Sequence, residues 1–356
     1  MKDAPLCLNS FQQNALDVFR IMAALSVVIG HSFSYYQLTI FKNEQYFPYI
    51  QNIGVVVFFL LSGFLTTFSI ARKNSTHKYT FKEFFIHKFF RINKEYIPGL
   101  IFIGIIDCFS IIINKDLYPY YSAFNIEQFI ANAFMLQNMG PHAILSQYFI
   151  PFGSGRPLWT LSIEWWLYML FGFIFLYVTN KRKLTFVPFC ALVFIVFMIS
   201  GHLVSGRGNG LGVVFALGIL GYYSYQSIGY RCAKVIFPST VALYIIYGFM
   251  VKNAYTKISF VILALMLISL LRIGLNTKYK GGRNKILAFI SKSTFMLYLL
   301  HYSIIDLIFR SNAFNDLYVN FIMGIVISST LSCFIYYVLI EKNVAGNFID
   351  KMKTHI

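Results

Sequence analysis

Ten stretches of mostly apolar residues run along the 356-residue chain, and shorter polar segments separate them. A helix needs about 20 apolar residues to cross the hydrocarbon core of a bilayer, and each stretch approaches that length. A backbone in lipid must also satisfy its own hydrogen bonds. The pattern therefore predicts an all-α, polytopic membrane bundle of about ten transmembrane helices. The predicted spans are residues 15–37, 50–70, 96–113, 158–178, 185–201, 211–228, 237–252, 258–275, 288–309 and 317–340.

The composition agrees with this pattern, because 58% of the residues are hydrophobic and only 12% are charged. Soluble domains average about 25% charged residues. We therefore predict one transmembrane domain over residues 12–345, followed by a short cytoplasmic basic tail, 346–356. The net charge is +17, but the basic residues fringe the apolar stretches. That distribution is typical of cytoplasmic loops and does not indicate a nucleic-acid partner.

Basic residues also predict the orientation of the chain. With the N-terminus inside, the inner segments carry twenty lysines and arginines and the outer segments carry seven. Because cytoplasmic loops are enriched in Lys and Arg, this bias predicts that both termini are cytoplasmic. An odd number of spans would remove the asymmetry.

Two segments between the spans have unusual compositions. Residues 71–96 are basic and rich in phenylalanine, which predicts an interfacial amphipathic helix on anionic lipid. The outer loop 114–157 is long and rich in Tyr and Asn, and includes a short predicted helix near 126–137. Loops of this length are often binding loops or lids.

Ionisable residues inside membrane spans are rare and usually functional. Arg20 and His31 are both on the first predicted span, eleven residues apart. That spacing is close to three helical turns, so the two side chains share one face about 16 Å apart. At its depth, His31 would be a base, a proton relay or a buried structural group. The other candidates are Asp107, Glu164, His301 and Glu341.

Two further stretches have both a packing and a functional interpretation. Ser62 and Gly63 in LLSGFL allow close approach of either a neighbouring helix or a ligand. The stretch PLWTLSIEWWLY contains Trp159, Trp165 and Trp166, which is typical of an interfacial aromatic belt. Glu164 lies between these tryptophans, where a carboxylate can orient or protonate a partner. Asp107 has no evident partner, and we expect it to serve packing or a polar pathway.

Six short motifs, taken in order, resemble those of the membrane-bound acyltransferase-3 family, which includes O-antigen and polysaccharide O-acetyltransferases. They are Asp17-Val-Phe-Arg20 with His31-Ser32, Ser62-Gly63-Phe64, Lys88-Phe-Phe-Arg91 followed by Pro98, Trp159-Thr-Leu-Ser162-Ile-Glu164, Tyr298-Leu-Leu-His301 and Glu341-Lys342. The resemblance covers about residues 12–345. The chain departs from the family at Lys88 (usually Arg), at Thr160 (usually Ser) and at Trp165-Trp166 (usually Glu-Gln).

The resemblance implies transfer of an acetyl group from cytoplasmic acetyl-CoA to a saccharide hydroxyl outside a bacterial plasma membrane. In this interpretation, the catalytic residues are His31, Glu164 and Arg20. The residues implied to bind coenzyme A are Lys88, Arg91, Ser62 and Gly63, and those implied to bind the acceptor are Trp159, Ser162, Tyr298 and His301. Glu164 would orient a histidine or the acceptor. A thioester is already activated, so we expect no metal.

Three alternatives remain open from the sequence. A proton-coupled carrier would also use buried His31, Asp107 and His301, although the chain has no evident inverted repeat. A sensor or assembly subunit would keep the fold without the chemistry. A related enzyme would move another acyl group, such as succinyl, or use a lipid or small-molecule acceptor. We expect no room for the extracytoplasmic hydrolase-like domain that some relatives carry.

Overall fold

A computed structural model describes residues 7–38, 50–140, 147–204, 210–251, 256–277 and 281–342. Within these residues all regular structure is helical, with single 3-10 turns at Lys115–Leu117 and Arg156–Leu158 and a π-helical turn at Tyr337–Glu341. The α-helices in chain order are α1 (Ser10–Tyr36), α2 (Ile50–Asn74), α3 (Phe81–Ile113), α4 (Ile126–Ala133), α5 (Trp159–Thr179), α6 (Phe186–Val204), α7 (Leu211–Ser224), α8 (Tyr230–Val251), α9 (Lys257–Asn276), α10 (Lys285–Ser311) and α11 (Leu317–Tyr336).

Each predicted span coincides with one of these helices, and α4 lies within the short helix predicted near 126–137. In the described part of the chain, seven helices are long and apolar enough to cross a membrane. Helices α6 and α7 are apolar but shorter, and α10 is long but carries more polar residues. A helical membrane bundle is thus confirmed, whereas the count of ten spans stays a prediction. The predicted tail 346–356 lies outside the described residues.

Helix α3 differs from the prediction of an interfacial helix followed by a separate span. It runs without a break from Phe81 to Ile113, although Pro98 lies inside it. Thr80 caps its start, since its hydroxyl accepts from the Glu83 backbone N–H while Glu83 accepts from the Thr80 backbone N–H. Proline removes one backbone donor, which membrane helices tolerate where neighbouring groups satisfy the freed carbonyl. The basic segment therefore continues directly into the span.

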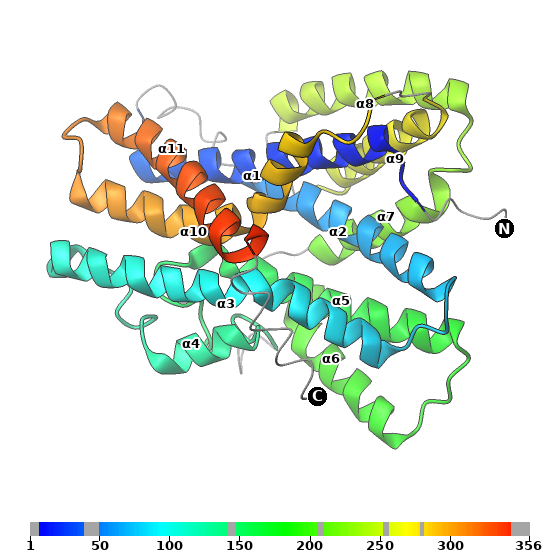
Figure 1. Cartoon of the computed structure of the whole chain (residues 1–356), viewed down its shortest axis with the longest axis horizontal. Helices are drawn as coiled ribbons and strands as arrows, with labels where there is room; N and C mark the ends of the chain where they lie inside the picture. Colours follow the sequence, from blue (N-terminus) through cyan, green and yellow to red (C-terminus); the bar gives the residue numbers. More distant parts are fainter. Residues whose placement is uncertain are drawn as a thin grey trace.

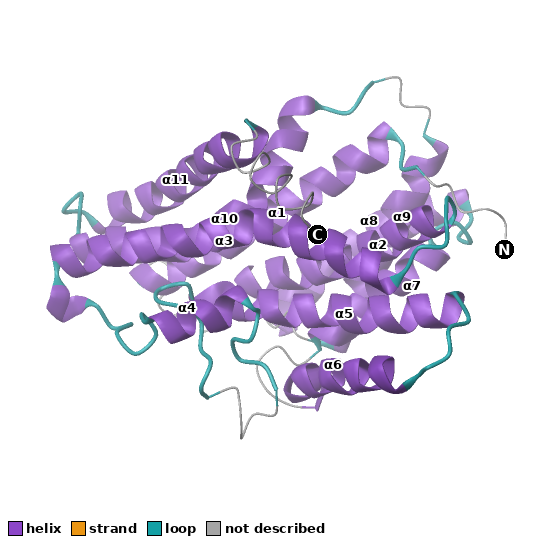
Figure 2. Cartoon of the chain, turned by 60° about the horizontal axis from the view of Figure 1, so that its bottom comes forward, coloured by secondary structure: helices purple, strands orange, loops and turns teal. Residues whose placement is uncertain are grey.

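Five helices form a closed ring that surrounds the candidate site. Around this ring α1 contacts α2, α2 contacts α5, α5 contacts α3, α3 contacts α10, and α10 returns to α1. Figures 1 and 2 show α3 and α10 running side by side along the long axis of the molecule, with α5 beside α3. Helix α11 covers α10 outside the ring.

Small residues set the contact between α2 and α7. A Cβ atom on Gly63 would overlap the Phe215 backbone, and one on Gly218 would overlap the Leu60 carbonyl. The two helices therefore approach at backbone distance, as in other membrane helix pairs with small residues at the interface.

The outward faces are apolar. Only 6% of the most apolar stretch of α8 is buried inside the protein. On α3, Ile112 is 78% exposed. Phe186 at the start of α6 is 79% exposed. Such a surface would be unstable in water, so these faces fit contact with the acyl chains of a lipid bilayer.

Candidate functional site

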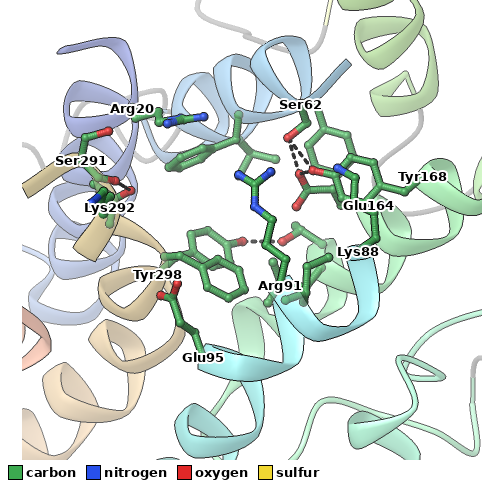
Figure 3. A pocket seen from close by; sticks show the side chains of 18 of the residues that line it. Arg20, Ser62, Lys88, Arg91, Glu95, Glu164, Tyr168, Ser291, Lys292 and Tyr298 are labelled. Carbon is green, nitrogen blue, oxygen red and sulfur yellow. Dashed lines mark hydrogen bonds between the residues drawn. The ribbon is translucent and has the colours of Figure 1, made fainter. Parts of the chain in front are cut away.

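A cavity of about 310 Å³ lies inside the helix ring, and we call it the basic cavity. Four cations and two carboxylates line it: Arg20, Lys88, Arg91, Lys292, Glu95 and Glu164. In Figure 3 the Arg91 side chain extends into its centre. Arg91 and Lys292 are exposed, whereas Lys88 is buried. The excess of positive charge suits an anionic ligand.

One side of the basic cavity holds a hydrogen-bonded cluster around Glu164. The Ser62 and Tyr168 hydroxyls both donate to Glu164 Oε1, and Figure 3 draws these bonds. Lys88 Nζ donates to Thr66 Oγ1 at 2.9 Å and lies 3.5 Å from the centre of the Tyr168 ring. The resemblance implies that Glu164 orients a histidine or the acceptor. In the structure its carboxylate accepts from Ser62 and Tyr168, and the role toward the acceptor stays a prediction.

Helix α1 is fixed near its N-terminal end by an ion pair. Asp17 is buried and accepts three hydrogen bonds from Arg283, at 2.9 to 3.2 Å. Arg20 lies 3.9 Å from the same carboxylate. A bidentate arginine–carboxylate pair adds geometric specificity, so Asp17 holds α1 against the start of α10 and keeps Arg20 beside the basic cavity.

A second and larger cavity, of about 830 Å³, lies beyond the basic cavity, and we call it the aromatic cavity. Its lining includes seven hydroxyl-bearing or aromatic side chains besides His31, and two arginines, Arg156 and Arg310. The aromatic side chains of this lining are Tyr35, Tyr120, Trp159, Tyr302 and Phe309. The loop 114–157 contributes Tyr120 and Pro157 to this lining, and Trp159 follows at the start of α5. A loop of this length was expected to be a binding loop or a lid.

His31 is paired with His301 of α10. His31 Nδ1 and His301 Nε2 are 2.9 Å apart, and the two rings stack with centroids 5.1 Å apart. His301 is fully buried, and its Nδ1 lies 3.0 Å and 2.9 Å from the carbonyl oxygens of Leu297 and Tyr298. Carbonyl oxygens only accept, so Nδ1 of His301 carries its proton and Nε2 accepts from His31. The lone pair of neutral His31 is therefore on Nε2.

Asp306 organises the rim of the aromatic cavity, and the sequence analysis did not single it out. Its buried carboxylate accepts from the hydroxyls of Tyr35 at 2.8 Å and Tyr120 at 3.1 Å. Arg310 pairs with it at 2.8 Å. Burial, and then the charge of Asp306, raise the pKa of Tyr120, so that phenol stays a donor. The i,i+4 spacing of Asp306 and Arg310 was the available sequence signal.

Asp107 anchors the loop that enters the aromatic cavity. Its Oδ2 accepts the backbone N–H of Ser154 at 2.8 Å, and the Ser154 hydroxyl donates to Ser303 at 2.6 Å. Gly153 next to it has a φ of +53° and stands so close to Asp107 that a side chain would overlap the carboxylate. Asp107 therefore serves packing, one of its two expected roles.

Two other predicted site residues lie away from the cavities. Gly63 is packed against α7, so the helix-packing interpretation of its motif accounts for it, whereas its neighbour Ser62 lines the basic cavity. Ser162 is fully buried and donates to the carbonyls of Gln137 and Trp159, both at 2.8 Å. Ser162 thus fixes the outer loop to α5 and does not face a ligand.

The remaining predicted residues divide between the two cavities. Arg20, Lys88, Arg91, Glu164 and Tyr298 line the basic cavity. His31 and Trp159 line the aromatic cavity. His301 lies behind His31 and contacts it directly. Glu341 is half exposed and lies 4.0 Å from Lys292.

A family model described as an acyltransferase domain matches residues 13–341. The chain belongs to the acyltransferase-3 family. The resemblance inferred from the six motifs is thus confirmed, and the chain carries the family's acyltransferase domain. An O-acetyl transferase of Shigella phage Sf6 is 24% identical over 239 residues, which cover 65% of this chain and 63% of that protein. The chain thus spans less than two thirds of this relative. No solved structure matches the present chain.

Proposed function

We propose that this protein is a membrane O-acetyltransferase. It moves an acetyl group from cytoplasmic acetyl-CoA to a hydroxyl of an extracytoplasmic saccharide, such as an O-antigen, a capsule, an exopolysaccharide or a lipid-linked precursor. The observation that carries this proposal is the course of α1, which places Arg20 at the basic cavity and His31 at the aromatic cavity. One helix thus joins an anion site to a candidate base. The name of the phage relative supports the same chemistry.

The basic cavity suits the phosphates of the acyl donor. Arg91 and Arg20 present planar guanidinium groups, which match phosphate oxygens in bidentate fashion. Lys292 adds an exposed point charge at the same opening. Lys88 is buried against the Tyr168 ring, so it contributes through its field and through the Glu164 cluster. Ser62, held by Glu164, faces the path of the pantetheine arm.

His31 is suited to activate the acceptor. The lone pair on Nε2 takes the proton from the acceptor hydroxyl while that oxygen attacks the thioester carbonyl carbon. The carbon–sulfur bond then breaks, and the leaving sulfur receives the proton from His31. In a second route the same nitrogen attacks the thioester carbon and the carbon–sulfur bond breaks, which leaves an acetyl-imidazole and a thiolate. The acceptor oxygen then takes the acetyl group from the nitrogen, and its proton passes to the thiolate. In both routes His301 positions the imidazole and fixes its tautomer.

The aromatic cavity is suited to a saccharide acceptor. Its volume of about 830 Å³ is within the range of small-molecule pockets. Trp159 and Tyr302 offer flat apolar faces for sugar rings, while Tyr35 and Tyr120 offer hydroxyls held in place by Asp306. The positive-inside pattern puts this cavity on the outer side of a bacterial plasma membrane and the basic cavity on the cytoplasmic side.

The deciding experiment measures the O-acetyl content of the surface glycan of the host bacterium by NMR. A deletion strain is complemented with the wild type, with His31→Ala or with His77→Ala, an exposed histidine outside both cavities. Membrane expression of the three proteins is matched by immunoblotting. We expect acetyl signals with the wild type and His77→Ala, and none with His31→Ala. An unchanged glycan in all strains would favour the carrier hypothesis, and full activity of His31→Ala would refute the role of His31.

A further inference from the structure

Three residues form a thin partition between the basic cavity and the aromatic cavity. The Thr160 and Tyr298 hydroxyls are 2.5 Å apart. Both also lie within hydrogen-bond distance of the Pro157 carbonyl oxygen, at 3.1 Å from Thr160 and 3.2 Å from Tyr298. Thr160 and Tyr298 are buried, and Figure 3 shows Tyr298 at the edge of the basic cavity with its hydrogen bond drawn.

Residues that line the two cavities contact one another at this partition. Thr160 and Tyr298 line the basic cavity, Pro157 and Trp159 line the aromatic cavity, and no described residue lines both. The Tyr298 ring is 5.8 Å from that of His301, which contacts His31. The Thr160–Tyr298 hydrogen bond therefore lies between the basic cavity and the His301–His31 pair.

We infer that Thr160 and Tyr298 are positioning residues that keep the thioester apart from the aromatic cavity until an acceptor is bound. The inference rests on the proposed function. In this partition, two side-chain hydroxyls lie within hydrogen-bond distance of one backbone carbonyl. Breaking it requires the loss of one or two hydrogen bonds and a rotation of the tyrosine side chain, which is a small cost in free energy. Binding of a saccharide beside Pro157 and Trp159 supplies the contacts that offset it.

The partition discriminates between an acceptor hydroxyl and water. In an open protein without acceptor, a water molecule at His31 would attack the carbonyl carbon of the thioester. The carbon–sulfur bond would break, the proton would pass through His31 to the sulfur, and acetate and free coenzyme A would result. A closed partition suppresses this loss because water in the aromatic cavity cannot reach the carbonyl group.

The test measures release of the coenzyme A thiol from acetyl-CoA, in the absence of any saccharide, by the purified full-length protein in lipid nanodiscs. Thr160→Val and Tyr298→Phe each remove one hydroxyl with little change in shape, and Thr160→Ser keeps the hydroxyl as the matched control. We expect thiol release to rise roughly three- to tenfold in Thr160→Val and Tyr298→Phe, which corresponds to the loss of one hydrogen bond. Thr160→Ser, which keeps the hydroxyl, is expected to release the thiol at the wild-type rate.

Two results would overturn the inference. One is thiol release at the wild-type rate by Thr160→Val and Tyr298→Phe, while both still acetylate the glycan in cells. The other is equal release by Thr160→Ser and Thr160→Val, because the hydroxyl would then not hold the partition closed. A failure of the proposed function is distinguishable: the wild type would not bind radiolabelled coenzyme A in equilibrium dialysis, and the inference would fall with it.

Discussion

At the scale of single residues, the polar side chains inside the helices have two kinds of role. Some face a cavity, as Arg20 and His31 do, and others hold the residues that face it. His301 is of the second kind, because its two backbone contacts leave Nε2 free of a proton and so determine which nitrogen of His31 is basic. The effect of His301 on catalysis would therefore depend on one hydrogen-bond acceptor, Nε2.

We predict that His301→Asn and His301→Gln will differ strongly in activity. The glutamine amide oxygen reaches the position of Nε2 and can accept from His31, whereas asparagine is too short. His301→Asn should lower acetyl transfer in isolated membranes about a hundredfold, the scale of a lost general base. His301→Gln should remain within roughly tenfold of the wild type, since its amide oxygen still orients the base. Equal loss in both variants would mean that His301 supports only the fold.

A second prediction concerns the donor. Arg91→Ala should raise KM for acetyl-CoA by roughly ten- to a hundredfold, which corresponds to a lost charge-assisted hydrogen bond to phosphate. The control is Lys82→Ala, which removes an exposed cation from the same helix outside the basic cavity. Steady-state kinetics with purified protein measure both. If Arg91→Ala and Lys82→Ala raise KM for acetyl-CoA equally, Arg91 acts only through the overall positive charge of the surface.

The sequence could predict which polar residues matter better than it could predict their partners. Arg20, His31 and Glu164 were predicted because a charge or an imidazole in an apolar span is costly, whereas Lys88 and Arg91 were predicted through the family motif. The pairing of His31 with His301 joins positions 270 residues apart, and periodicity carries no information on such contacts. For the same reason the contact of Glu164 with Ser62 could not be predicted, and Glu164 was expected to orient a histidine or the acceptor.

At the scale of elements, helix positions follow from the hydrophobic pattern and helix contacts follow from small residues. The predicted spans match the helices because each is long and apolar. Continuity of α3 through Pro98 was missed, since proline usually ends a helix in water. The close packing of α2 on α7 was visible only as the ambiguous motif Ser62-Gly63.

We predict that Gly63→Ala will destabilise the protein and that Gly248→Ala will not. The added methyl group at Gly63 would overlap the α7 backbone, which cannot move as a side chain can. Gly248 on α8 has open space around it, and alanine is the better helix former. The midpoint of thermal unfolding in detergent should fall by several degrees for Gly63→Ala and should be unchanged or higher for Gly248→Ala. Unchanged midpoints in both would show that α2 and α7 separate without cost.

At the scale of the whole molecule, the proposed reaction requires the two cavities to open on opposite sides of the membrane. The charge bias predicts this orientation. We expect Ser122→Cys to react with a membrane-impermeant maleimide in intact spheroplasts, and Lys78→Cys to react only after lysis. Both positions are exposed, and the native cysteines would first be replaced by serine. The opposite labelling pattern would invert the orientation and exclude cytoplasmic acetyl-CoA as the donor of the basic cavity.

The eleven-residue separation of Arg20 and His31 on α1 fixes the distance between the two residues. The two residues are about 16 Å apart along the helix axis. The backbone of neither can shift without moving the whole helix, which the ion pair between Asp17 and Arg283 holds in place. A donor must therefore carry its charged handle and its acyl carbon at opposite ends of a long arm. Acetyl phosphate has the right charge and the right acyl group, but it is too short to reach both Arg20 and His31. Under the proposed function, the protein would thus select its donor by length as well as by charge.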